Sequence, residues 1–213
     1  MAKDLSQLNI AIGSGYREHP LDTTIRDAFF VMADKNIYGP ALDNSGNPVY
    51  TSITMSDLYD ATSNVIGQGT QVEITAAQTA LAGKKGWFIW LNESGGSFIG
   101  EKVLAKSLTF SDMLMFTTYT PIAANTGACS PSQGRALTYL VNIKDGTAIY
   151  DFNKSGGTIL TQEDRRMNLI RGGIPPEPSL LFHENGPVIL IGTEKAPDLQ
   201  LLLTPRKTYW KTK

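Results

Sequence analysis

The sequence has few of the residues that build metal sites and disulfide frameworks. Its 213 residues contain one cysteine, Cys129, and two histidines, His19 and His183. A lone cysteine cannot form an internal disulfide bond, and these three residues fall short of the four ligands of a structural zinc site. Any bound metal ion would therefore need oxygen ligands.

Charge and long apolar runs are also scarce. Charged residues make up 18% of the chain, and 19 basic against 20 acidic side chains leave a net charge of −1. This balance provides no field to attract nucleic acid or an anionic membrane surface. No apolar run reaches the roughly 20 residues of a membrane span, and residues 1–7 lack the apolar stretch of a secretory signal. We therefore expect no nucleic-acid partner and no membrane span.

The chain is instead rich in turn residues, with 20 glycines and 11 prolines. Together with the low charge, this composition favours a mainly β protein and disfavours an all-helical one. Short apolar or alternating runs predict the strands. They are expected within 8–15, 27–34, 86–92, 101–112, 113–120, 135–152, 176–194, 198–205 and 208–210.

The turns between these runs predict their pairing. Residues 8–15 and 27–34 are expected to form a hairpin, with Leu8, Ile10 and Ile12 on the buried face of the first strand. The three runs from 86 to 120 predict a meander. Asp145-Gly146 and Asn185-Gly186 are typical hairpin turns, so each predicts a further strand pair.

Two short helical insertions are expected between the strands. Ser56 is placed to cap a helix of one or two turns. Thr75 and Gln78 have capping-box spacing, and Gly83 is placed to end that second helix in the left-handed conformation.

A weak internal repeat indicates how the strands are assembled. IAIGSG at 10–15 and VILIGTE at 188–194 are both apolar runs ending in Ile-Gly-Ser or Ile-Gly-Thr. We interpret them as parts of separate sheets of a modified β-propeller, in which a blade takes roughly 40–50 residues. Residues 1–213 would then be one portion of a single propeller domain that is incomplete as a ring.

One segment has part of a calcium-loop pattern. Asp43, Ser45 and Asn47 occupy its first, third and fifth places, where short oxygen side chains converge on a hard cation. However, Pro48 replaces the required glycine, and Thr54 replaces the bidentate acid. A polar turn is the favoured interpretation.

Nucleotide and nucleophile motifs are incomplete. Gly13 and Gly15 suggest a dinucleotide loop, but Glu18 stands where its third glycine belongs. Ser97 is outside any G-x-S-x-G elbow. His19 and His183 are expected in polar loops with no orienting partner, and solvent exposure is expected for both. Cys129 is a reactive thiol, a lone remnant or half of a bridge to residues outside this chain.

Two segments remain as candidate binding sites, one aromatic and one basic. Alternation places Trp87 on one face of its strand and Phe88 and Trp90 on the other. Core packing between blades is favoured over a groove for carbohydrate or a partner. The basic end at 206–213 either contacts an anionic surface, is simply solvated, or supplies a closing strand.

A family resemblance is carried by several segments in a fixed order. They are NIAIGSGYREHPLDTTIRDAFFVM, ITMSDLYDAT, KKGWFIWL, KVLAKSLTFSDMLMFTTYTP, ACSPSQGRALTYLVNIKDG, GGIPPEPSLL and VILIGTE. In order and spacing they resemble the C-terminal domain of the PilY/PilC family of type IV pilus proteins, over about residues 8–210.

The resemblance implies a modified β-propeller within a large exported protein at the pilus tip, the outer membrane or the periplasm of a Gram-negative bacterium. Its expected role is non-enzymatic: pilus biogenesis, surface adhesion and twitching motility through loop contacts with pilins, minor pilins, or host and abiotic surfaces. The family's regulatory calcium loop matches nothing here, so no cofactor is expected in this chain. The rest of the propeller is expected upstream of Met1.

Two alternatives stay open. A quinoprotein-like or glycan-active propeller enzyme would present an axial pocket lined by charged and aromatic groups. A purely structural propeller subunit would expose apolar edges and self-associate. No catalytic, cofactor-binding or metal-binding residue is assigned from the sequence.

Overall fold

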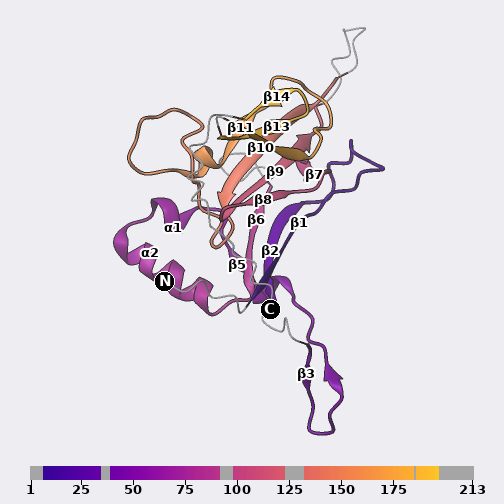
Figure 1. Cartoon of the computed structure of the whole chain (residues 1–213), viewed down its shortest axis with the longest axis vertical. Helices are drawn as coiled ribbons and strands as arrows, with labels where there is room; N and C mark the ends of the chain where they lie inside the picture. Colours follow the sequence, from indigo (N-terminus) through magenta and orange to yellow (C-terminus); the bar gives the residue numbers. More distant parts are fainter. Residues whose placement is uncertain (1–6, 35–38, 92–97, 123–131, 185, 197–213) are drawn as a thin grey trace, which may run out of the picture.

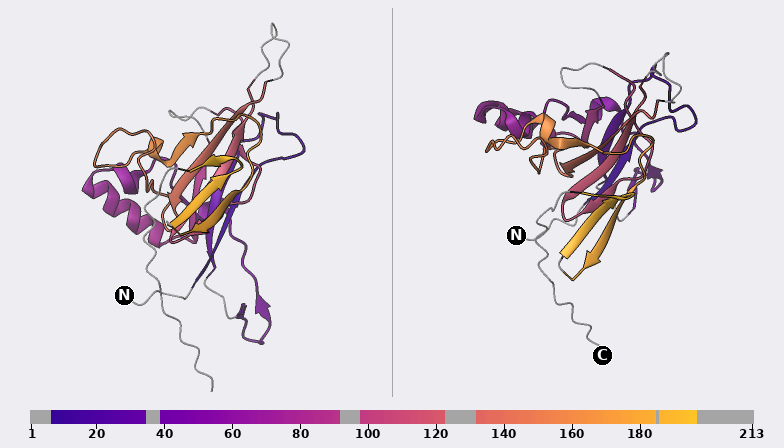
Figure 2. Two further views of the ribbon diagram at one scale, coloured as in Figure 1. Left: turned by 45° about the horizontal axis from the view of Figure 1, so that its top comes forward. Right: turned by 90° about the horizontal axis from the view of Figure 1, so that it is seen from above.

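The chain folds into small β-sheets that stack on one another. The structure is a computed structural model that describes residues 7–34, 39–91, 98–122, 132–184 and 186–196. Within these ranges the sheets lie face to face with helices and loops at one side (Figures 1 and 2). The prediction of a mainly β protein with several antiparallel sheets is confirmed. The described sheets do not close into a ring.

The N-terminal sheet has the strand order β1-β2-β6-β5. Its strands are β1 (Leu8–Gly13), β2 (Ala28–Asp34), β6 (Gly86–Trp90) and β5 (Tyr59–Asp60). The predicted hairpin of β1 and β2 is confirmed as an antiparallel pair. Strand β5 is parallel to β6, a pairing that the sequence did not predict.

The central sheet has the order β11-β10-β9-β7, with β8 also paired to β9. Its strands are β11 (Arg166–Asn168), β10 (Arg135–Asn142), β9 (Met113–Thr120), β7 (Lys102–Val103) and β8 (Leu108–Phe110). The meander predicted from 86 to 120 is wrong, because β6 belongs to the N-terminal sheet. The run 101–112 also divides into two short strands, both of which pair with β9.

The C-terminal sheet has the order β12-β13-β14. Its strands are β12 (Pro178–His183), β13 (Gly186–Ile191) and β14 (Glu194–Lys195). The predicted hairpin between β12 and β13 is confirmed, with His183 opposite Gly186. The strands predicted at 198–205 and 208–210 lie outside the described residues.

Of the hairpin predicted at Asp145-Gly146, only the turn is present. The Gly146 N–H donates to the Asn142 carbonyl at 2.9 Å, and Gly146 has the positive φ of 70° that such a turn requires. Beyond the turn, the second strand is reduced to a single bridge between Val141 and Ala148. Strand β11 pairs with β10 instead, so the prediction of a full hairpin is wrong.

The described residues form four helices rather than the two that were expected, and their caps differ from the prediction: Thr54, not Ser56, is the N-cap residue of the first helix. The helices are the 3-10 helices η1 (Met55–Asp57) and η2 (Gln162–Arg165) and the α-helices α1 (Val65–Gln68) and α2 (Gln71–Ala82). None of the helices that the structure describes is long and apolar enough to cross a membrane. A small arm projects from the sheets, formed by β3 (Ala41–Leu42) and β4 (Pro48–Val49) (Figure 1).

The cap of α2 is formed by Thr70 and Glu73, because the Glu73 carboxylate accepts from the Thr70 N–H at 2.8 Å. The predicted cap residue Thr75 lies inside the helix and bonds back to the Gln71 carbonyl. A glutamate near a helix N-terminus also interacts favourably with the helix dipole, which glutamine does not. Gly83 ends the helix with a φ of −82°, so the left-handed cap is also wrong.

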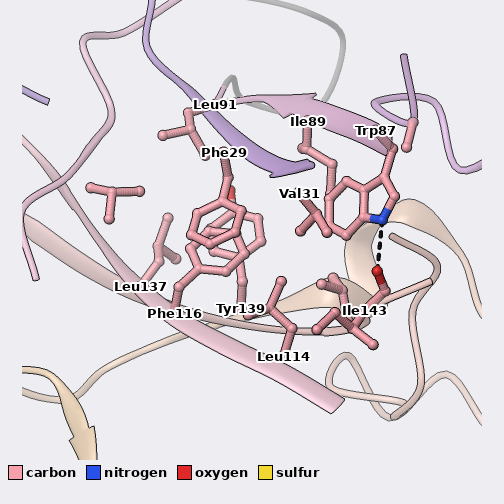
Figure 3. Packing of buried hydrophobic residues seen from close by; sticks show 13 residues of the cluster. Phe29, Val31, Trp87, Ile89, Leu91, Leu114, Phe116, Leu137, Tyr139 and Ile143 are labelled. Carbon is pink, nitrogen blue, oxygen red and sulfur yellow. Dashed lines mark hydrogen bonds between the residues drawn. The ribbon is translucent and has the colours of Figure 1, made fainter. Parts of the chain in front are cut away.

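Two apolar cores hold the three sheets together. The first lies between the N-terminal and central sheets and contains Phe29, Trp87 and Phe116 (Figure 3). The second lies on the opposite face of the central sheet, where Met115 and Leu140 contact the C-terminal sheet. The central sheet is therefore apolar on both faces, as expected for a blade between two others.

Candidate interaction surface

The outer row of strand β1 is exposed and apolar. Leu8, Ile10 and Ile12 are 57%, 46% and 53% exposed, so the prediction that they form the buried face is wrong. The alternation is present, but the inward positions are Asn9, Ala11 and Gly13. Gly13 lies so close to Val103 that a side chain there would clash. The strand therefore turns its small residues to the core and its large ones to the outside.

The β1 row continues across the outer face of the N-terminal sheet. Ile10 is opposite Met32, and Ile12 is opposite Phe30, which are both half-buried. Phe30 is in turn opposite Phe88, which is only 6% exposed, so the exposed part of the row ends there. Exposed apolar patches of this kind are typical of interaction sites.

A cleft of about 860 Å³ opens beside the end of β1. Its walls come from β1, from the segment 103–107 and from the segment 174–177. Its charged lining residues are Arg17, Lys106 and Glu177, and Arg17 donates to the Leu104 carbonyl. The cleft therefore combines small and apolar residues of β1 with both basic and acidic side chains.

Asp43, Ser45 and Asn47 come together as the turn of the arm. The Asp43 carboxylate accepts from the backbone N–H groups of Ser45 and Asn47, both at 2.8 Å. Its hydrogen bonds with Asn47, above all, hold the pKa of Asp43 below its usual value. The preferred interpretation as a polar turn fits this arrangement. No group of three or more His, Cys, Asp or Glu side chains that could hold a metal ion occurs among the described residues.

The other candidate residues are dispersed. His19 is exposed, with its ring 4.6 Å from that of Tyr16. His183 ends β12 rather than lying in a loop. Gly15 is followed by a loop rather than by the helix of a dinucleotide site. Ser97, Cys129 and the basic end at 206–213 lie outside the described residues.

The aromatic residues of β6 divide between two faces as predicted. Trp87 is 1% exposed in the first core, and its indole N–H donates to the Ile143 carbonyl at 2.9 Å (Figure 3). Phe88 and Trp90 lie on the outer face with their ring centroids 5.5 Å apart. The Arg26 guanidinium lies 4.3 Å from the Trp90 ring, a cation–π contact.

Glu101 is a fully buried acid that sequence reasoning missed. Its Oε1 accepts hydrogen bonds from Thr118 Oγ1 at 2.6 Å and from the Tyr139 hydroxyl at 2.8 Å. Its Oε2 lies 4.0 Å from the Arg166 guanidinium. Burial raises the pKa of Glu101, and the hydrogen bonds and the nearby guanidinium partly oppose this rise. No local motif marks this residue, because its partners come from β9, β10 and β11.

Glu101 is expected to make stability depend on pH. Because its pKa is raised on folding, the folded state holds the proton more tightly, and stability falls as pH rises from the usual glutamate pKa through the raised value. Glu101→Gln should remove this fall and stay within about 1 kcal/mol of the wild type at neutral pH. Glu101→Ala should cost about 2–4 kcal/mol, because two buried hydroxyls lose their acceptor. Urea unfolding at several pH values measures both effects. If stability fell with pH as steeply in Glu101→Gln as in the wild type, Glu101 would not be the source of the pH dependence.

The stacked sheets, antiparallel except for the β5–β6 pair, define a mainly β protein. No family model and no curated protein matches the sequence. Among solved structures, the chain is similar to the crystal structure of the PilY1 C-terminal domain from Pseudomonas aeruginosa, with a TM-score of 0.54 and 13% sequence identity. The match covers 88% of this chain and 40% of that one. The likeness expected from the sequence is thus confirmed at the level of the fold.

Proposed function

We propose that this chain is a non-enzymatic module of a type IV pilus biogenesis and adhesion factor. The observation that carries the proposal is the structural likeness to the PilY1 C-terminal domain over 88% of the chain. The segments that resemble the PilY/PilC family support the same role independently of the structure. The module would act at the pilus or cell surface, where it supports pilus extension, attachment and twitching motility.

The distribution of polar and apolar groups favours binding over catalysis. The buried ionic groups Glu101 and Arg165 are engaged in contacts that join different elements of the fold. Several large apolar side chains, in contrast, are exposed, and they include the β1 row. Pilins, minor pilins and host or abiotic surfaces are the proposed partners, because covering exposed apolar surface removes it from water and so lowers the free energy.

Deletion of the gene tests the role in cells. We expect the deletion strain to have fewer surface pili, weaker attachment and smaller twitching zones, and the wild-type gene to restore all three. Pilus counts by electron microscopy, crystal-violet attachment and stab-agar twitching assays measure them. Unchanged piliation and attachment in the deletion strain would refute the proposal. Quinone absorbance in the purified protein, or turnover of an alcohol or glycan, would favour an enzyme instead.

A further inference from the structure

A second cavity, of about 760 Å³, lies at the base of the arm that projects from the sheets (Figure 1). Its walls come from four parts of the chain: β1, the end of β2, the arm with the segment that follows it, and the end of α2. Pockets for small ligands commonly measure roughly 300–1,000 Å³ and combine apolar walls with a few polar groups. The size of this cavity lies within that range.

Backbone hydrogen bonds between segments that are distant in the sequence hold the base of the cavity. The Ala33 N–H of β2 donates to the Lys85 carbonyl at 2.8 Å, and the Lys85 N–H donates to the Asp57 carbonyl at 2.9 Å. The Lys84 ammonium also donates to the Ser56 carbonyl at 2.6 Å. These bonds join β2, η1 and the segment after α2, so the polar groups at the base are positioned before any ligand binds.

An exposed tyrosine lies on the wall of the cavity. Tyr50 directly follows β4 and is 82% exposed, so its ring is not packed into a core. Ile10, Val49 and Ile53 line the same cavity and are also exposed. A tyrosine offers an apolar ring face together with a hydroxyl that donates and accepts. Tyr50 therefore gives the cavity a flat face on which a ring of a ligand can stack.

The polar side chains of the cavity include both acceptors and donors. The Asp34 carboxylate can accept hydrogen bonds, and the Thr51 hydroxyl can donate and accept. The ammonium groups of Lys84 and Lys85 are donors. An Asp57 oxygen lies 3.8 Å from the Lys85 ammonium, so two acidic groups balance the two lysines. This mixture gives no preference for a strongly charged ligand and suits one that is rich in hydroxyl groups.

A saccharide has both of the required properties. Its hydroxyl groups donate and accept, and the C–H groups on one face of its ring pack on an aromatic ring. We infer that this cavity binds a short neutral oligosaccharide, with one sugar ring stacked on Tyr50 and its hydroxyls bonded to Asp34, Thr51 and the two lysines. The inference is argued from the cavity alone. It does not depend on the proposed pilus function, to which it adds a ligand for surface adhesion.

The other aromatic and cleft positions lack this combination of groups. Among the described residues that line the cleft beside β1, none is aromatic. On β6, Trp87 and Phe88 are buried, and the Arg26 guanidinium lies over the ring of Trp90. The aromatic rings of β6 are therefore engaged in contacts within the chain, whereas the ring of Tyr50 is open to a ligand.

Titration of the purified chain with neutral saccharides tests the inference. The probes are lactose, N-acetyllactosamine, maltotriose and chitotriose, and NMR signals of labelled methyl groups report where they bind. At least one probe should shift the methyl signals of Ile10, Val49 and Ile53 in a saturable way, with a dissociation constant of about 0.1–5 mM. The signal of Ile170, which is exposed outside the cavity, should not move. If no probe shifts the three signals, or if only the anionic sugar sialyllactose does, the inference is wrong.

Substitutions in the cavity separate stacking from hydrogen bonding. Tyr50→Ala should raise the dissociation constant about tenfold or more, whereas Tyr50→Phe keeps the ring and should stay within about threefold of the wild type. Thr51→Val keeps the shape but removes a hydroxyl, and should weaken binding about threefold to tenfold.

Tyr16→Ala is the matched control, because Tyr16 is an exposed tyrosine outside the cavity and its loss should leave binding unchanged. Both tyrosines are exposed, so the variants should fold, which circular dichroism checks. Equal binding by the wild type and Tyr50→Ala overturns the inference. Because binding is measured on the isolated chain, that outcome leaves the cellular test of pilus function unaffected.

Discussion

Replacing Phe116 with alanine is expected to lower the free energy of unfolding by about 3–5 kcal/mol, the usual cost of removing a buried aromatic ring. Phe116 is completely buried in β9. Its ring stacks on the ring of Phe29, in the N-terminal sheet, at a centroid distance of 3.9 Å. It also stacks on the ring of Tyr139, which lies in the central sheet like Phe116, at 4.7 Å (Figure 3). The substitution therefore opens a cavity at the contact between two sheets, which neighbouring side chains cannot fill without moving a strand.

Chemical denaturation with guanidinium chloride measures this loss. Phe182→Ala is the matched control, because that ring is 68% exposed and should cost less than about 1 kcal/mol. Phe116→Leu keeps most of the volume and should fall between the two. If Phe116→Ala and Phe182→Ala cost the same, the sheets are not joined through this stack.

The parts of the fold that follow local chemistry could be predicted from the sequence. The pairing of β1 and β2 follows from two apolar runs joined by a long polar connection. The opposite faces of Trp87 and Phe88 follow from the two-residue period of a strand. The hairpin of β12 and β13 follows from a turn between apolar runs. In each case the interacting residues are close in the sequence.

The predictions that are wrong concern features that depend on contacts with residues far away in the sequence. Alternation in β1 shows that one face is apolar, but it cannot show that Val103 approaches Gly13 and so reserves the inner face for small residues. Likewise, Asp145-Gly146 forms its turn, but β11 takes part of the edge of β10 that a hairpin partner would have used. Glu101 escaped notice for the same reason, since its partners come from strands far along the chain.

Arg165 is expected to be as important to stability as the aromatic stack, although it lies in a 3-10 helix outside the sheets. It is 2% exposed, and its guanidinium donates to the carbonyls of Ala61 and Thr62 at 2.7 and 2.8 Å and to Asn64 Oδ1 at 3.0 Å. Burial lowers the pKa of Arg165 to about 10, so it still carries its charge at neutral pH. These hydrogen bonds thus connect η2 to the segment that follows β5, about a hundred residues earlier in the chain.

Arg165→Ala should therefore cost about 3–5 kcal/mol, because it leaves buried acceptors without donors as well as a cavity. Arg165→Met restores the volume but none of the hydrogen bonds, so most of the loss should remain if the donors are what matters. Arg165→Lys retains the charge but not the planar fork, and should recover only part of it. Arg171→Ala, at an exposed position, is the control and should stay within about 0.5 kcal/mol of the wild type. Urea unfolding ranks the four variants, and full recovery by Arg165→Met would show that packing, rather than the three hydrogen bonds, holds η2 against the N-terminal sheet.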